Sequence, residues 1–169
     1  MKNKNFKFLG ENVKLHEYSK FVHQEVIEIG EGSQIDDFVL INGGSETVIG
    51  RYNHIASFVG VIGGGRFITG DYVGIAVGTK IITGTHHYGD GRRISPLIPV
   101  DEQCVIRGEI RLGDDVFIGA NVTIFPNVTI GEGAIIGAAS LVKDNVEPWS
   151  IYVGTPAKKV GVRPKIEKP

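Results

Sequence analysis

VFIGANVTIFPNVTIGEGAIIGAAS, which spans residues 116–140, carries an aliphatic residue at every sixth position. Counted outward from this stretch, one phase holds seven aliphatic residues in succession: Ile106, Leu112, Ile118, Ile124, Ile130, Ile136 and Val142. The positions four residues later are small or branched: Ile110, Val116, Val122, Val128, Ala134 and Ser140. An amphipathic helix requires apolar spacings of three and four, and a hairpin protein requires alternation between polar turns, so a period of six indicates neither.

The N-terminal half follows the same rule in triplets, with a spacing of six inside a triplet and eight between triplets. The triplets are Leu9, Leu15, Phe21, then Ile29, Ile35, Ile41, then Ile49, Ile55, Val61, then Thr69, Ile75, Ile81. Each turn is therefore three hexads plus two residues. Six residues of extended chain ending in a bend make one side of a triangular coil, and such coils stack about 4.8 Å apart. We predict an all-β fold, a parallel β-helix of hexapeptide repeats.

The six-residue spacing of aliphatic residues is interrupted in two places. Between Ile81 and Ile106 the chain contains two histidines, two arginines and two prolines, which predicts a protruding loop at about 87–105. After Val142 the sequence turns polar. We expect one domain over residues 1–169, with coils at about 9–144 and a short, weakly structured C-terminal tail at about 145–169.

Composition limits the partners and the compartment. The formal net charge is −1, which predicts no general attraction to nucleic acid, and no apolar run is long enough for membrane insertion. The polar start and the single cysteine, Cys104, favour a reducing cytoplasm. The 24 glycines are interleaved with Ile and Val, which indicates many tight turns rather than a linker.

Residues 116–140 and the ending Gly154-Thr-Pro-Ala-Lys158 resemble the hexapeptide-repeat acyltransferases. Within that family the sequence is most similar to the maltose and galactoside acetyltransferases and their relatives in surface-polysaccharide synthesis. The resemblance implies a left-handed coil, a homotrimer with active sites between subunits, and acetyl-CoA as co-substrate without a required metal. It also implies transfer of acetyl to a hydroxyl or amino group of a sugar.

The gap-free match over residues 69–86 ends at His86, which takes the place of the family's catalytic histidine. Acyl transfer requires a base, because the attacking group must lose a proton, and imidazole with its ordinary pKa of about 6.5 suits that role. His86 could instead be the first polar residue of an exposed loop. Its neighbour His87 could be the base, orient His86 or face solvent.

The 20-residue period stacks positions 46, 66 and 86, and so predicts that Arg66 lies about one strand spacing, roughly 4.8 Å, from His86. Gly64 and Gly84 then belong to a parallel row that leaves a groove for the acceptor sugar, with Arg66 near a hydroxyl or a nucleotide phosphate. The alternative is a surface ion pair between Arg66 and Glu46.

Asn53 and His87 complete the candidate acceptor contacts. The residues with which the galactoside enzymes contact their substrate are missing from the preceding coil. We therefore expect a deoxy- or amino-sugar acceptor, either free or nucleotide-linked.

For the coenzyme, the resemblance implies contacts at Phe117, Ala120, Ala138, Lys143 and Lys158. The alanines would admit the pantetheine arm and the lysines would meet phosphates. Plain corner packing and solvated lysines are the alternatives. Two other functions share the fold: a non-catalytic scaffold or binding module, and a γ-type carbonic anhydrase. The latter requires three convergent imidazoles, which adjacent strand residues cannot supply because they point to opposite sides.

Overall fold

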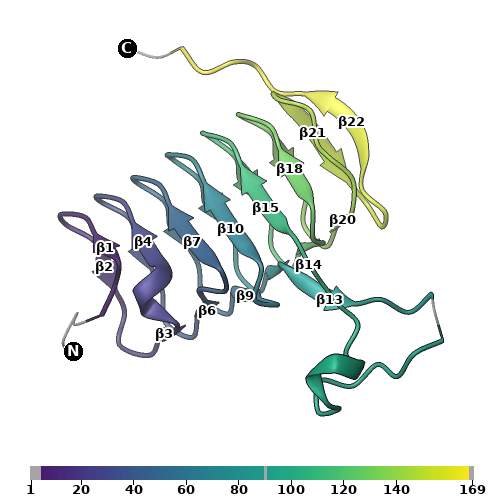
Figure 1. The fold of residues 1–169 in the computed structure, drawn as a ribbon. Coiled ribbons are helices and arrows are strands. Elements are labelled where there is room, and N and C mark those ends of the chain that lie inside the picture. Colours follow the sequence, from purple (N-terminus) through teal and green to yellow (C-terminus); the bar gives the residue numbers. More distant parts are fainter. Residues whose placement is uncertain (1–4, 90, 168–169) are drawn as a thin grey trace.

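The computed structural model describes residues 5–89 and 91–167. Over this range the backbone winds into a parallel β-helix whose three flat sides are parallel sheets, here named A, B and C (Figure 1). Figure 1 shows the strands of sheet A side by side from the purple N-terminal end to the green C-terminal end. The predicted all-β fold of hexapeptide repeats is confirmed.

The three sides are built from short strands. Sheet A contains β1 (Phe8–Leu9), β4 (Ile27–Ile29), β7 (Glu46–Ile49), β10 (Arg66–Thr69), β15 (Glu109–Leu112) and β18 (Val128–Ile130). Sheet B contains β2 (Lys14–Leu15), β5 (Gln34–Ile35), β8 (His54–Ile55), β11 (Gly74–Ile75), β16 (Phe117–Ile118), β19 (Ile135–Ile136), β21 (Ser150–Val153) and β22 (Lys158–Val162). Sheet C contains β3 (Lys20–Val22), β6 (Leu40–Asn42), β9 (Gly60–Ile62), β12 (Lys80–Ile82), β17 (Thr123–Ile124) and β20 (Leu141–Val142).

The register between coils matches the sequence period. Leu9 pairs with Ile29, twenty residues on, whereas Leu112 pairs with Ile130, eighteen residues on. The two extra residues of the N-terminal coils are taken up between sheets C and A, at what we call the C–A corner. In the first coil the 3-10 helix Gln24–Val26 occupies this corner.

The interior is filled by the aliphatic rows that the period defines. Ile29, Ile55, Ile81 and Ile118 are at most 1% exposed. The second row of the C-terminal half is at most 2% exposed: Ile110, Val116, Val122, Val128, Ala134 and Ser140. Branched side chains at equivalent positions in successive coils pack directly on one another. Burying each of them stabilises the fold by about 1.5–3 kcal/mol.

The first predicted member of the C-terminal row, Ile106, is misplaced. It is 38% exposed and lies in β14 (Val105–Arg107), which pairs antiparallel with β13 (Gly84–His86). The coil resumes only at Glu109. The two strands form the base of the protruding loop, which also contains the 3-10 helix Val100–Glu102 and projects away from the coils in Figure 1. We call β13 and β14 the ribbon.

The expectation of a weakly structured tail from residue 145 is wrong in part. Val146 forms a parallel bridge with Ile130, and β21 pairs parallel with β19, so the coil continues to Val153. β22 then folds back antiparallel on β21 as the last strand of sheet B. The first four and last two residues of the predicted domain lie outside the described residues. No helix within residues 5–89 and 91–167 is long and apolar enough to cross a membrane.

One buried polar side chain links three coils. Asn53 is 2% exposed; its Nδ2 donates to the Thr69 hydroxyl (2.6 Å) and the Gly70 carbonyl (3.0 Å). Its Oδ1 accepts the N–H of Val73 (2.7 Å), and its own N–H donates to Ser33 (3.0 Å). Every polar group of Asn53 is used inside the helix, so its predicted contact with the acceptor is wrong.

We expect Asn53→Ala to lower the free energy of unfolding by about 2–3 kcal/mol, because it leaves buried backbone groups at residues 70 and 73 unpaired. Urea unfolding measures the change. Asn145→Ala is the control: Asn145 also accepts a backbone N–H, from Thr129 at 2.8 Å, but it is exposed and water replaces it. Equal losses in the two variants would contradict the structural role of Asn53.

A second prediction concerns Asp71, whose carboxylate accepts hydrogen bonds from the Arg51 side chain (2.6 and 3.0 Å) and backbone (2.7 Å). The Arg51 bond lowers the pKa of Asp71. A lowered folded pKa stabilises the fold above the unfolded value of about 3.9, and that contribution is lost as pH falls through the folded pKa.

Asp71→Asn should therefore cost about 1 kcal/mol at neutral pH and reduce the loss of stability between pH 5 and pH 3. Thermal melts across this range measure the slope. Asp144→Asn, at an exposed site beside Lys143, is the matched control and should keep the wild-type slope. An unchanged slope in Asp71→Asn would refute the assignment.

Candidate functional site

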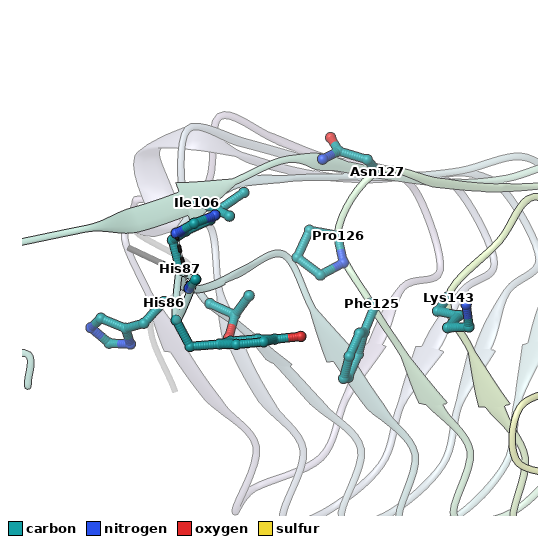
Figure 2. Close-up of a pocket in the computed structure, with 10 residues that line it drawn as sticks. His86, His87, Ile106, Phe125, Pro126, Asn127 and Lys143 are labelled. Atoms are coloured by element: carbon teal, nitrogen blue, oxygen red, sulfur yellow. Dashed lines mark hydrogen bonds between the residues drawn. The ribbon is translucent and has the colours of Figure 1, made fainter. Parts of the chain in front are cut away.

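The ribbon holds the two adjacent histidines on opposite faces. Its register pairs Thr85 with Ile106 and His86 with Val105, so side chains alternate between the faces. Figure 2 shows the His87 ring beside Ile106, while the His86 ring points away from Phe125 and Lys143. His87 thus faces the C-terminal coils, and His86 shares its face with Val105.

The face toward the C-terminal coils borders a pocket of about 450 Å³, here called the ribbon pocket (Figure 2). It is lined by Thr85, His86, His87, Tyr88, Gly89, Ile106, Phe125, Pro126, Asn127 and Lys143. Phe125 and Pro126 give it an apolar wall, and Lys143 places a half-exposed ammonium at its edge, 3.5 Å from Asp144. Such a wall with one cation suits a ligand that has an apolar arm and an anionic end.

The Nε2 atom of His86 is buried and has no hydrogen-bond partner among the described residues. Buried polar atoms are nearly always paired, because an unmade hydrogen bond in the interior costs about 1–3 kcal/mol. His86 is the one histidine in the described chain with an atom of this kind.

A second pocket, of about 410 Å³, opens at the C–A corner of the N-terminal coils. We call it the corner pocket; it is lined by His23, Asn42, Gly44, Ser45, Gly64 and Arg107. The predicted glycine row is therefore present at Gly44 and Gly64 but does not continue to Gly84. Gly84 has left the coil: it pairs with Arg107 in the ribbon, so close to Gly63 that a Cβ on Gly84 would lie 2.2 Å from the Gly63 carbonyl oxygen.

The predicted stacking of Arg66 beneath His86 is wrong. Arg66 pairs with Glu46 in one direction and with Glu109, not His86, in the other. Its guanidinium donates to Glu46 (2.6 Å) and to Glu109 (2.7 Å) on the outer face of sheet A. The physical reason is that the chain leaves the coil at Gly84, so residue 109 takes the rung that an unbroken period assigns to residue 86. The alternative of an ion pair with Glu46 is confirmed.

The coenzyme residues implied by the resemblance do not form one cluster. Ala120 and Ala138 occupy successive rungs at the corner between sheets B and C, where the N–H of Ala139 donates to the Ala120 carbonyl (2.8 Å). Phe117 lies on sheet B in β16, 47% exposed, and Lys158 starts the edge strand β22. Lys143 alone lines the ribbon pocket, at the opposite edge of sheet C.

Sequence reasoning missed Arg107, Phe125 and Pro126. Phe125 and Pro126 sit inside a perfect hexad, where they are read as outward-facing corner residues. Arg107 lies in a segment that the period assigns to the coil. After Gly108, charged and branched residues alternate as they do in the other strands of sheet A. This change of pattern was the signal that residues 105–107 belong to the loop.

Within the part of the chain that the structure describes, no three His, Cys, Asp or Glu side chains are grouped so that they could hold a metal ion.

Comparisons with known proteins agree with this architecture. Residues 109–144 match the model of the bacterial transferase hexapeptide (six repeats) family. A dTDP-4-amino-4,6-dideoxy-D-glucose acyltransferase of Escherichia coli is 34% identical over 98% of this chain and 86% of its own length. A probable macrolide acetyltransferase of Lysinibacillus sphaericus is 43% identical over 55% of this chain and 58% of its own.

Among solved structures, the N-acyltransferase AntD of Bacillus cereus, crystallised with dTDP and 3-hydroxybutyryl-CoA, superposes with a TM-score of 0.88. It is 35% identical, and the match covers 95% of this chain and 85% of AntD. A hexapeptide-repeat acetyltransferase of Vibrio cholerae in complex with acetyl-CoA gives a TM-score of 0.65 at 27% identity, over 95% of this chain and 73% of that one. The repeat, the fold and the near full-length relatives together place this chain in the hexapeptide-repeat acyltransferase family.

Proposed function

We propose that the chain transfers an acyl group from an acyl-CoA to the amino group of a nucleotide-linked deoxyamino sugar. The Escherichia coli relative is named for such an acceptor, and AntD was crystallised with both a thymidine nucleotide and an acyl-CoA. We place the reaction in the cytoplasm, where acyl-CoA and nucleotide sugars are made, and in the supply of modified sugars for surface polysaccharides.

The observation that carries the proposal is the position of the ribbon between two pockets. On one side lies the ribbon pocket, built from the C-terminal coils with an apolar wall and Lys143. On the other side lies the corner pocket, built from the N-terminal coils with glycines and Arg107. Each recess offers a site for one of the two anionic substrates, and the ribbon that carries His86 borders both.

His86 is the proposed base. The acceptor nitrogen attacks the thioester carbonyl carbon, so that a C–N bond forms and the C–S bond breaks through a tetrahedral oxyanion. The proton released by the nitrogen passes to the imidazole of His86, and the coenzyme thiolate leaves and is protonated. The match of residues 69–86 to the family stretch that ends in its catalytic histidine supports this role.

We further propose that the working enzyme is a homotrimer whose donor site is shared. Ala120 and Ala138 lie at one edge of sheet C and Lys143 at the other, so one chain does not bring them to the same pocket. A neighbouring subunit could place its alanine corner beside the ribbon, with its Phe117 and Lys158 nearby. The coenzyme would then lie between two chains.

An exposed aromatic stack supports association. Tyr18, Phe38 and Phe58 are 62%, 55% and 57% exposed, and their rings stack at centroid distances of 5.7 and 5.2 Å. Contiguous exposed apolar surface of this kind typically marks an interface.

The central test mixes the purified protein with acetyl-CoA and dTDP-4-amino-4,6-dideoxyglucose and follows thiol release. We expect acceptor-dependent release, and a fall in kcat of about 10²–10⁴-fold in His86→Ala. His16→Ala, which removes an imidazole that follows β2 and lines neither pocket, is the control and should keep wild-type turnover. Absence of release despite coenzyme binding would refute the acceptor class. Loss of turnover in His87→Ala but not in His86→Ala would transfer the base to His87.

A second prediction concerns the donor. Lys143→Gln should raise the Kd for coenzyme A about 3- to 10-fold at low salt and by less at high salt, because exposed charge interactions are screened. Isothermal titration calorimetry measures both values. Lys14→Gln, at the far end of the helix, should leave the affinity unchanged; an equal loss in both variants would indicate only a general charge effect.

A further inference from the structure

The corner pocket contains one guanidinium that no carboxylate neutralises. Arg107 is exposed, and its side chain forms no hydrogen bond or ion pair with any described residue. Glu109, two residues further along the chain, is occupied by Arg66 (2.7 Å) and Arg111 (2.8 Å). Most arginines of the coils are paired in this way, so an unpaired one at the mouth of a pocket is an exception.

The pocket around Arg107 is shaped for close approach to backbone. A Cβ placed on Gly64 would lie 3.2 Å from Nε of Arg107, and Gly64 has a φ of +76°, which favours glycine. The guanidinium therefore rests against bare backbone. The lining residues carry no carboxylate, and His23 adds a ring whose Nδ1 lies 3.3 Å from Glu25. The local charge favours an anion.

Arg107 also lies on the same face of the ribbon as His86. The register pairs Gly84 with Arg107 and His86 with Val105, and alternation puts these positions on one side. Arg107 is two strand positions from Val105, which corresponds to roughly 6.6 Å along the ribbon. That separation is comparable with the span of one sugar ring joined to a phosphate.

We propose that Arg107 binds the diphosphate of the nucleotide-linked acceptor in the corner pocket and so positions the sugar amine at His86. This inference rests on the proposed function. Arginine presents two parallel N–H donors that match phosphate oxygens, and such charge-assisted pairs are about twice as strong as neutral ones. The 20-residue period predicted a phosphate contact for Arg66. The Arg66 guanidinium instead donates hydrogen bonds to Glu46 and Glu109.

The test measures the binding of dTDP, thymidine and coenzyme A to the wild type and to Arg107→Gln by calorimetry. We expect Arg107→Gln to weaken dTDP about 10-fold or more, with thymidine and coenzyme A unchanged. Arg107→Lys should recover part of the affinity, because a point charge remains. Arg66→Gln, the matched control in β10, should bind dTDP as the wild type does.

If dTDP binds Arg107→Gln and the wild type equally, the inference is overturned and the proposed function stands. If the wild type binds coenzyme A but not dTDP, the nucleotide-linked acceptor is excluded, and the proposed function falls together with the inference. If Arg66→Gln rather than Arg107→Gln loses dTDP, the phosphate lies on sheet A and the corner pocket is not its site.

Discussion

Stacking of successive coils in register constrains every other feature of this protein. Each rung hydrogen-bonds to the rungs on both sides, and each interior side chain must fill the space above its own row, so residues cannot be inserted within a side. Insertions are tolerated only at corners. The N-terminal coils use the C–A corner for their two extra residues, and the excursion from residue 84 to residue 107 begins and ends there. The candidate site is therefore at that corner because the stacking permits it nowhere along a flat side.

The same constraint explains what could be predicted from the sequence. Interior rows such as Leu9, Ile29 and Ile49 were predictable because each aliphatic residue pairs with another one coil away. The ribbon was not, because antiparallel pairing breaks the period and shifts the partner of Arg66 from residue 86 to Glu109. The tail was misjudged for a related reason. The last coil has sixteen residues instead of eighteen, because Ile130 pairs with Val146 and Ile136 with Tyr152, so its residues fall out of phase with the hexads before it.

In the candidate site the coils and the ribbon position a small number of side chains that could bind substrates or transfer a proton. Two pockets lie on either side of a ribbon that carries His86 and His87 on opposite faces. The rigid coils hold Phe125, Lys143 and the corner glycines, whereas the histidines stand on an excursion that is tied to the coils only at its base. The proposed donor contacts thus stand on the rigid coils, whereas the proposed base and Arg107 stand on the ribbon.

A crystal structure with coenzyme A and dTDP bound together tests the central claim most directly. We predict the diphosphate at Arg107 and the coenzyme thiol within reach of the imidazole of His86, so that the acceptor amine and the thioester carbon can meet. A diphosphate remote from Arg107, or a coenzyme thiol remote from His86, would contradict the proposed site.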